Sequence, residues 1–220
     1  MTAPMTMNRL IHAAVRRDLD RLTSALDDVA DGDRDRAAEL ERAFANLRRE
    51  LTHHHEGEDI HIWPMLAGVG VSSDLLGAME AEHHAMADAL TETDGVMSSF
   101  AASGSAADAA AARSSMARTQ AVVDQHLTHE EDDLEPQLLP HAESPAWKSV
   151  EKELSRQPLG VAGPFFAWLT DGMTAEHQAF LRRTVPTPVV FVLARVFGRR
   201  YTREVAPVWR TAAGAGRPRG

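Results

Sequence analysis

One phrase of sequence occurs twice in this chain, and it constrains the fold more than any other feature. Both copies fit the pattern H-x3-E-[ED]-x2-[IL]-x-P-x-L, which begins at His54 and again, 72 residues later, at His126. Residues four apart lie on the same face of a helix, so His54 and Glu58 point the same way, as do His126 and Glu130. Flanking hydrophobic residues indicate that this face is turned inward, where a carboxylate needs a partner or a cation.

Hydrophobic residues recur at helical spacing along most of the chain and predict an all-α protein. Four long helices are expected over about residues 7–30, 34–66, 73–100 and 108–139. Because short turns join them, we expect an up-down-up-down four-helix bundle over residues 1–140.

The rest of the chain is expected to form an α-helical C-terminal extension over residues 141–210, basic after residue 178. Its predicted helices cover about residues 144–156, 164–183 and 189–209, with a stiff break at 184–188. Residues 211–220 are expected to be a disordered tail.

The first and third predicted helices each bring one histidine to the level of the repeated phrase. His12 precedes His54 by 42 residues, and His83 precedes His126 by 43. The apolar spacing around His83 favours it over His84 as the inward residue. Four histidines and two glutamates are too many for one tetrahedral zinc and suit two metal ions that share carboxylates. The chain has no cysteine, and imidazole with carboxylate points to iron or manganese before copper.

The neighbours of these residues are expected to lie outside the metal site. Asp59 and Glu131 each follow a glutamate of the phrase by one residue, so they point about 100° away and are expected to be surface acids. The run Glu130–Glu135 is expected to be solvated apart from Glu130 itself. Four histidines beside the phrase are expected at the surface or in support of the ligands: His53, His55, His61 and His129.

These residues make the chain resemble the hemerythrin-like proteins, which carry the HHE cation-binding domain, over about residues 7–140. The resemblance implies an up-down four-helix bundle with a non-haem di-iron centre, manganese being the less expected metal. It implies oxygen, hydrogen peroxide or nitric oxide as the small ligand. It also implies terminal ligands and bridging carboxylates at these positions: His12, His54, His83 and His126 as terminal ligands, and Glu58 and Glu130 as bridges.

The chain departs from the invertebrate oxygen carriers of this family at two places. Where they have a second histidine on the third helix, this sequence has Ala87, and its second phrase is H-x3-E where theirs is H-x4-D. Water, His84, Asp88 or another side chain is expected to complete the site. An open position favours reactivity over inert oxygen carriage.

Two uses of such a site are therefore open. In the first, the site binds a small oxidant or reacts with it. If the reaction turns over repeatedly, the protein is an oxidoreductase that consumes peroxide or nitric oxide. Alternatively, it is an oxygen or iron sensor that signals through its C-terminal segment. A third class is a metal-free structural bundle.

Charge is unevenly distributed along the chain. The net charge of −9 argues against nucleic-acid binding, but residues 178–220 hold nine arginines and one acid, against 14 basic and 31 acidic residues before them. This split favours packing of 189–209 on the acidic bundle, its arginines facing bundle carboxylates. Contact with a membrane surface or a protein partner is the alternative, and the oligomeric state is left open. No signal or spanning stretch is visible, so a cytoplasmic location is expected.

Overall fold

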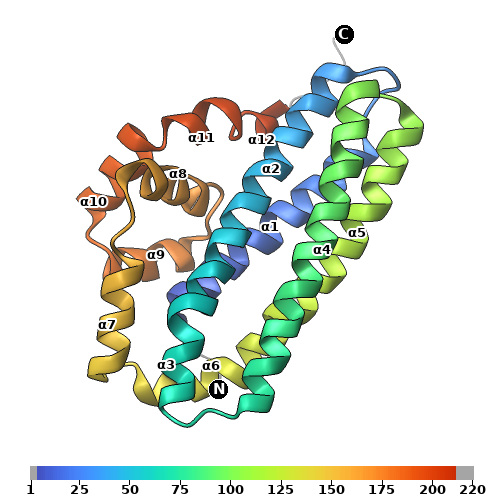
Figure 1. The fold of residues 1–220 in the computed structure, drawn as a ribbon. Helices are drawn as coiled ribbons and strands as arrows, with labels where there is room; N and C mark the ends of the chain where they lie inside the picture. Colours follow the sequence, from blue (N-terminus) through green and yellow to red (C-terminus); the bar gives the residue numbers. More distant parts are fainter. Residues whose placement is uncertain (1–3, 212–220) are drawn as a thin grey trace.

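The computed structural model describes residues 4–211, and these residues form helices and turns with no strand (Figure 1). The all-α prediction is confirmed. The first part, here called the body, contains α1 (Met7–Asp27), α2 (Arg34–Gly57), η1 (Glu58–Ile62), α3 (Trp63–Gly68), α4 (Ser73–Ser103), α5 (Ala106–His129), η2 (Glu130–Leu134), α6 (Glu135–Leu138) and η3 (Leu139–His141). The second part, here called the extension, contains α7 (Pro145–Leu154), α8 (Leu159–Thr170), α9 (Ala175–Thr184), α10 (Thr187–Val192), η4 (Leu193–Phe197), α11 (Arg199–Glu204) and α12 (Val208–Thr211).

Each long helix of the body begins at a side chain that accepts a hydrogen bond from the first turn, which stabilises the helix start. The capping residues are Thr6, Asp33, Ser72 and Ser105. At its other end, α4 stops at Gly104, whose φ of 65° suits a residue without a Cβ. The Gly104 carbonyl accepts the N–H of Gly32 at 2.8 Å, which joins two turns at this end of the body.

The four long helices α1, α2, α4 and α5 lie side by side (Figure 1). Helix α1 contacts α2 and α5, and α4 contacts the same two helices. Apolar residues at helical spacing on three of these helices are buried together in one hydrophobic core: Leu10, Val15, Leu19, Leu22 and Leu26 of α1, Leu40, Phe44, Leu47 and Leu51 of α2, and Met86 and Leu90 of α4.

Both copies of the repeated phrase pass through a wide, π-helical turn. η1 begins at Glu58, and the Trp63 N–H donates to the Glu58 carbonyl five residues back; η2 repeats this from Glu130. Pro64 and Pro136 follow the two turns. A proline has no N–H and its ring clashes with the carbonyl four residues before it in an α-helix, and the wide turn relieves both problems. Pro64 therefore does not end the helix.

The extension packs on the body and shares its core. Helix α8 contacts α1, and α12 contacts α2. Trp168 of α8 is fully buried, and its indole Nε1 donates to Asp18 Oδ2 of α1 at 2.8 Å. Tyr201 of α11 is also buried, and its hydroxyl donates to Asp171 at 2.9 Å. The predicted packing of 189–209 on the body is thus found in part: α12 contacts α2, whereas η4 and α11 pack on α8.

The two long helices predicted in the extension are each broken. The helix expected over 164–183 is divided into α8 and α9 near Gly172, which has a φ of 68°. The helix expected over 189–209 is interrupted by the π-helical turn η4 and by Gly198. A Cβ on Gly198 would lie 2.5 Å from Ala167 Cβ, so the glycine lets η4 approach α8 closely.

The predicted pairing of the extension's arginines with body carboxylates is wrong. Arg199 and Arg203 are exposed. The contact runs the other way, because Arg17 of the body donates to the Trp168 carbonyl at 3.2 Å and Arg21 to Asp171 Oδ2 at 3.1 Å. Arg17 also donates to the Asp171 carbonyl, so its guanidinium caps the C-terminal end of α8, where the Trp168 carbonyl accepts the Asp171 N–H as well.

Two further expectations concern the ends of the chain. Of the predicted disordered tail, Thr211 ends α12, and residues 212–220 lie outside the described residues. None of the helices between residues 4 and 211 is long and apolar enough to cross a membrane.

Candidate metal centre

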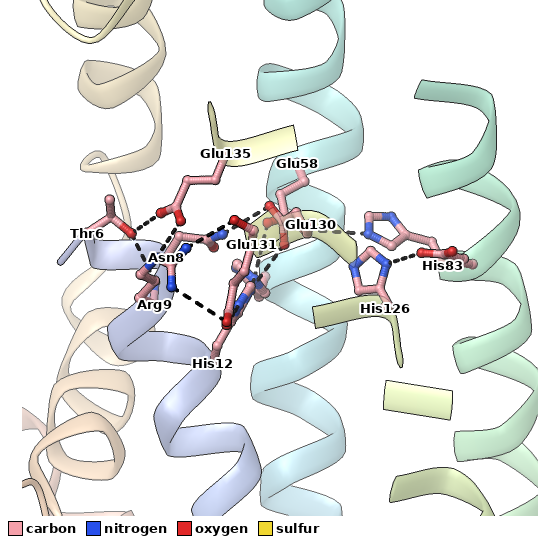
Figure 2. A network of polar contacts seen from close by, with 12 residues as sticks. Thr6, Asn8, Arg9, His12, Glu58, His83, His126, Glu130, Glu131 and Glu135 are labelled. Atoms are coloured by element: carbon pink, nitrogen blue, oxygen red, sulfur yellow. Dashed lines mark hydrogen bonds and ion pairs between the residues drawn. The ribbon is translucent and has the colours of Figure 1, made fainter. Parts of the chain in front are cut away.

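The six predicted ligands meet between the long helices of the body, together with one histidine that was not predicted. Figure 2 labels five of the six: His12, Glu58, His83, His126 and Glu130. They form two groups, and within each group the potential ligand atoms lie within 4.8 Å of one another. The carboxylate-rich group contains His12, His54, Glu58 and Glu130. The histidine-rich group contains His55, Glu58, His83 and His126. Glu58 belongs to both, and every member is buried except His54, which is nearly so.

The two glutamates stand differently toward these groups. Glu58 turns one oxygen to each, with Oε1 3.1 Å from His54 Nε2 and Oε2 3.5 Å from His83 Nε2. Glu130 turns only Oε2 inward, 3.1 Å from His12 Nε2, while its Oε1 accepts the Asn8 amide at 3.0 Å. Glu58 thus faces both groups, whereas Glu130 faces one. The predicted bridging roles of Glu58 and Glu130 both stay predictions.

Six buried atoms that face the groups have no hydrogen-bond partner among the described residues. They are the Nε2 atoms of His55, His83 and His126, both oxygens of Glu58, and Oε2 of Glu130. Leaving one such atom buried and unpaired costs about 1–3 kcal/mol. A cation at each group would satisfy these atoms together, so the residues present fit a pair of metal ions.

Carboxylates on the far side of the imidazole rings hold three of the histidines. Each Nδ1 lies 2.8–2.9 Å from a carboxylate oxygen. The pairs are His12 with Glu131, His83 with Asp59, and His126 with Glu82. An Nδ1–H that donates to a carboxylate fixes the tautomer in which the Nε2 lone pair faces the metal.

This arrangement corrects the prediction that the acids next to the ligands lie at the surface. Glu131 is largely buried, and besides His12 it accepts a hydrogen bond from Arg16. Glu135 is buried too, and it accepts hydrogen bonds from Thr6 and Arg9 of the α1 start (Figure 2). Asp59 is exposed as predicted, but it still reaches His83. The wide turns that follow Glu58 and Glu130 rotate these acids toward neighbouring helices.

Burial and charge set the protonation of the site before any metal binds. Burial, reinforced by the charge of His12, lowers the pKa of His54 to about 3, so its ring is neutral and keeps a lone pair that can bind a cation. Burial, together with the neighbouring Glu130 carboxylate, raises the pKa of Glu58 well above its usual range. Burial also opposes ionisation of Glu130, but contact with His12 outweighs it and lowers the pKa of Glu130 to about 2. A cation would remove the cost of ionising Glu58.

His55 is the site residue that the sequence analysis missed. It is buried, and its ring stacks on that of His83 with centroids 4.3 Å apart. The repeat hides it, because the second copy has Leu127 at the matching position. A usable signal was its spacing, since His55 and Glu58 are three residues apart and share a helix face. His84 and Asp88, the side chains named for the open position, are both exposed.

A hydrophobic cluster closes the body next to the histidine-rich group. It consists of Trp63, Leu66, Met79 and Leu134, all buried. The Trp63 ring stacks on His83 with centroids 5.6 Å apart. These side chains exclude water from one side of the groups, which strengthens electrostatic interactions within them.

Comparison with protein-family models matches residues 6–138 to the model described as Hemerythrin HHE cation binding domain. The match covers more than half of the chain, and it includes every member of both groups. It stops before α7, so the extension is not part of it. No curated protein and no solved structure matched the chain.

Proposed function

We propose, from the premise that the chain belongs to the hemerythrin HHE cation-binding family, that its two groups hold two iron ions. We further propose that this non-haem di-iron centre binds or reacts with oxygen, hydrogen peroxide or nitric oxide. The observation that carries the proposal is the convergence of buried, unpartnered imidazole and carboxylate atoms on two places joined by Glu58. An up-down-up-down bundle is part of it, supported by the contacts of α1 and α4 with α2 and α5.

The donor set supports iron, with manganese as the second choice. Seven side chains offer imidazole nitrogen or carboxylate oxygen, and the chain has no cysteine. Such donors suit iron, and a higher share of carboxylate oxygen suits manganese. The histidine-rich group favours iron more strongly than the carboxylate-rich group does.

The chain's own residues prepare the site for a small ligand. A bound iron pair supplies electrons and open coordination positions. Glu82, Asp59 and Glu131 fix the imidazole orientations, and Asn8 holds the outer oxygen of Glu130. The Trp63 cluster keeps bulk water from one side. The result is a preorganised and partly dry site that admits only small molecules.

Metal content per chain, measured by elemental analysis after anaerobic ferrous loading, tests this proposal. Wild type should hold two irons. His55→Ala should lose the iron of the histidine-rich group, whereas His53→Ala, a change of the half-buried neighbouring ring, which belongs to neither group, should keep both. Glu58→Ala should lose both ions because Glu58 is shared. Two irons in both His55→Ala and Glu58→Ala, with native circular dichroism, would overturn the proposed ligand set.

The reaction itself is tested with the loaded protein. Repeated consumption of peroxide or nitric oxide by wild type, and its loss in Glu58→Ala, would make the protein an oxidoreductase. An optical spectrum that changes reversibly with oxygen, without turnover, would make it an oxygen-binding protein. No spectral change with any of the three oxidants would contradict the proposed reactivity while leaving the metal site intact.

A sensor function is the second candidate, and one contact favours it. Helix α7 of the extension packs on η1 and α3. A Cβ on Gly57, the residue before Glu58, would lie 3.2 Å from Leu154 Cδ2 of α7. Movement of Glu58 on metal or oxygen binding would therefore displace α7 and change the packing of the extension. If so, protease cleavage within 184–211 should change when iron is added to wild type and stay constant in Glu58→Ala.

A further inference from the structure

The segment formed by α10 and η4 is hydrophobic on both of its sides. Val190 and Ala194 face inward and pack against the core. On the outer side stand Val189, Phe191, Val192 and Val196, all exposed, with Phe191 61% exposed. Helical spacing puts these four on one arc of about 160°, which also holds the exposed Arg195. A helix with apolar residues on both its inner and its outer side is normally buried, so the apolar part of this arc is expected to be covered.

Arginines surround the same arc. The guanidinium of Arg195 lies 5.9 Å from the Phe191 ring. A groove of about 230 Å³ runs between α9 and α10, with Leu181, Val185 and Val190 in its wall and Arg182 and Arg195 on its edge. From residue 177 to residue 203 the chain has six arginines and no acid, and all six are exposed. A partner that covers the arc must therefore offer an apolar surface to Phe191 and the valines and anionic groups to the arginines.

We propose that this docking surface, made of the exposed residues of 182–203, binds the surface of an anionic lipid bilayer. Phe191 and the valines would enter the acyl region, and the arginines would bind headgroup phosphates. Nucleic acid fits this surface less well. Its phosphates could bind the arginines but would offer no apolar surface to cover Phe191 and the valines. A second copy joined through the same surface would bring like charges together.

The charge of the whole molecule fits this orientation. Residues 1–177, which comprise the body, α7, α8 and the start of α9, carry 14 basic and 31 acidic side chains, so an anionic bilayer repels this part of the chain and attracts the basic segment after it. In Figure 1, α10 lies at the outer edge of the extension, on the side opposite α4 and α5. The docking surface can therefore meet a bilayer without contact from the acidic body. This proposal does not depend on the metal centre.

Flotation of the full chain with lipid vesicles tests the proposal. We expect flotation with vesicles of phosphatidylcholine mixed with phosphatidylglycerol, and none with phosphatidylcholine alone. Arg195→Glu should weaken binding about 30-fold, which corresponds to about 1 kcal/mol for each of two unit charges. Phe191→Ser should weaken it about tenfold. High salt should release the protein.

Matched substitutions on the body provide the controls. Arg118 is an exposed arginine of α5, and Arg118→Glu makes the same charge change there. Leu139→Ser removes an exposed apolar side chain of the body. Both variants should float like wild type. Iron-loaded and metal-free protein should also float equally.

Several outcomes would overturn the proposal. One is equal flotation with neutral and anionic vesicles, and another is no flotation with either. An Arg118→Glu effect as large as that of Arg195→Glu would mean that net charge alone is responsible. An unchanged Phe191→Ser variant would exclude insertion of the apolar arc. Capture by poly-glutamate beads without vesicle binding would show that the occupant is an acidic protein segment.

Discussion

Two buried carboxylates, Asp18 at the joint between body and extension and Glu58 between the long helices, stand in opposite situations. Asp18 is surrounded by donors, because the Trp168 indole, the Arg17 guanidinium and Arg21 all point to it at 2.8–3.3 Å. Glu58 is equally buried, yet neither of its oxygens has a hydrogen-bond partner among the described residues. The first carboxylate has its donors within the protein, and the second lacks them, which supports its proposed role as a metal ligand.

The difference teaches how to tell a structural acid from a ligand when both are buried. A buried carboxylate with several donors stabilises one packing arrangement, and its removal strongly lowers the free energy of unfolding. A buried charge without donors is a cost until its ligand binds, and then it becomes part of the binding energy. Substitution at the two residues should therefore have effects of different size in metal-free protein.

The largest effect is expected at Asp18. Asp18→Ala leaves the Arg17 guanidinium and the Trp168 indole without their acceptor, so the free energy of unfolding should fall by about 3–5 kcal/mol. Chemical denaturation measures this. Asp20→Ala, a change of the exposed neighbouring aspartate, should cost less than about 1 kcal/mol. Equal effects of the two substitutions would remove the distinction between a structural and a surface acid.

A smaller effect is expected at Glu82, which orients His126 without facing the metal groups. Glu82→Gln should weaken metal binding in the histidine-rich group about 10- to 100-fold, because the Nδ1 partner loses its charge. Competition with a chelator measures the affinity. Glu80→Gln, on an exposed position of the same helix, should leave it unchanged. A loss of unfolding free energy without a change in affinity would make Glu82 a purely structural residue.

The smallest effect is expected for Glu58→Gln in metal-free protein. The raised pKa of Glu58 already favours its neutral form, and the amide has the same shape and no charge, so the free energy of unfolding at neutral pH should change by less than about 1 kcal/mol. Added iron should then stabilise wild type and leave the variant unchanged. Denaturation curves with and without iron measure both. A large destabilisation of the metal-free variant would mean that Glu58, like Asp18, has partners inside the protein.

The sequence predicted the body well because two independent signals agree there. Helical spacing of apolar residues located the long helices, and the repeat located His54, Glu58, His126 and Glu130. The same repeat concealed His55, which has no counterpart in the second copy. The acids that orient the imidazoles were missed because their partners lie on other helices, and sequence spacing gives no information on contacts between helices.

The extension was predicted less well, for two physical reasons. Its run from Val189 to Ala194 is apolar at every position, so it has no periodicity from which a helix end can be located. The predicted contact between its arginines and the body carboxylates was inferred from the opposite net charges of the two segments. In the structure, Arg17 of the body donates to carbonyls at the C-terminal end of α8, whereas Arg199 and Arg203 are exposed. Local hydrogen-bond acceptors at a helix end thus decide the contact, and net charge does not.

The wide turn after Glu58 has a consequence for the phase of the helix. One additional residue in a turn rotates everything after it by about 100° relative to an unbroken α-helix. His54, His55 and Glu58 precede the wide turn or begin it, and they lie on the inner side of the helix. In an unbroken α-helix Trp63 would point away from this side, but the rotation places its ring against His83. The continuous segment α2–η1–α3 thus supplies ligands to both groups and also Trp63, the apolar side chain that covers the histidine-rich group. Deletion of one residue within η1 would restore the regular phase and open that end of the body.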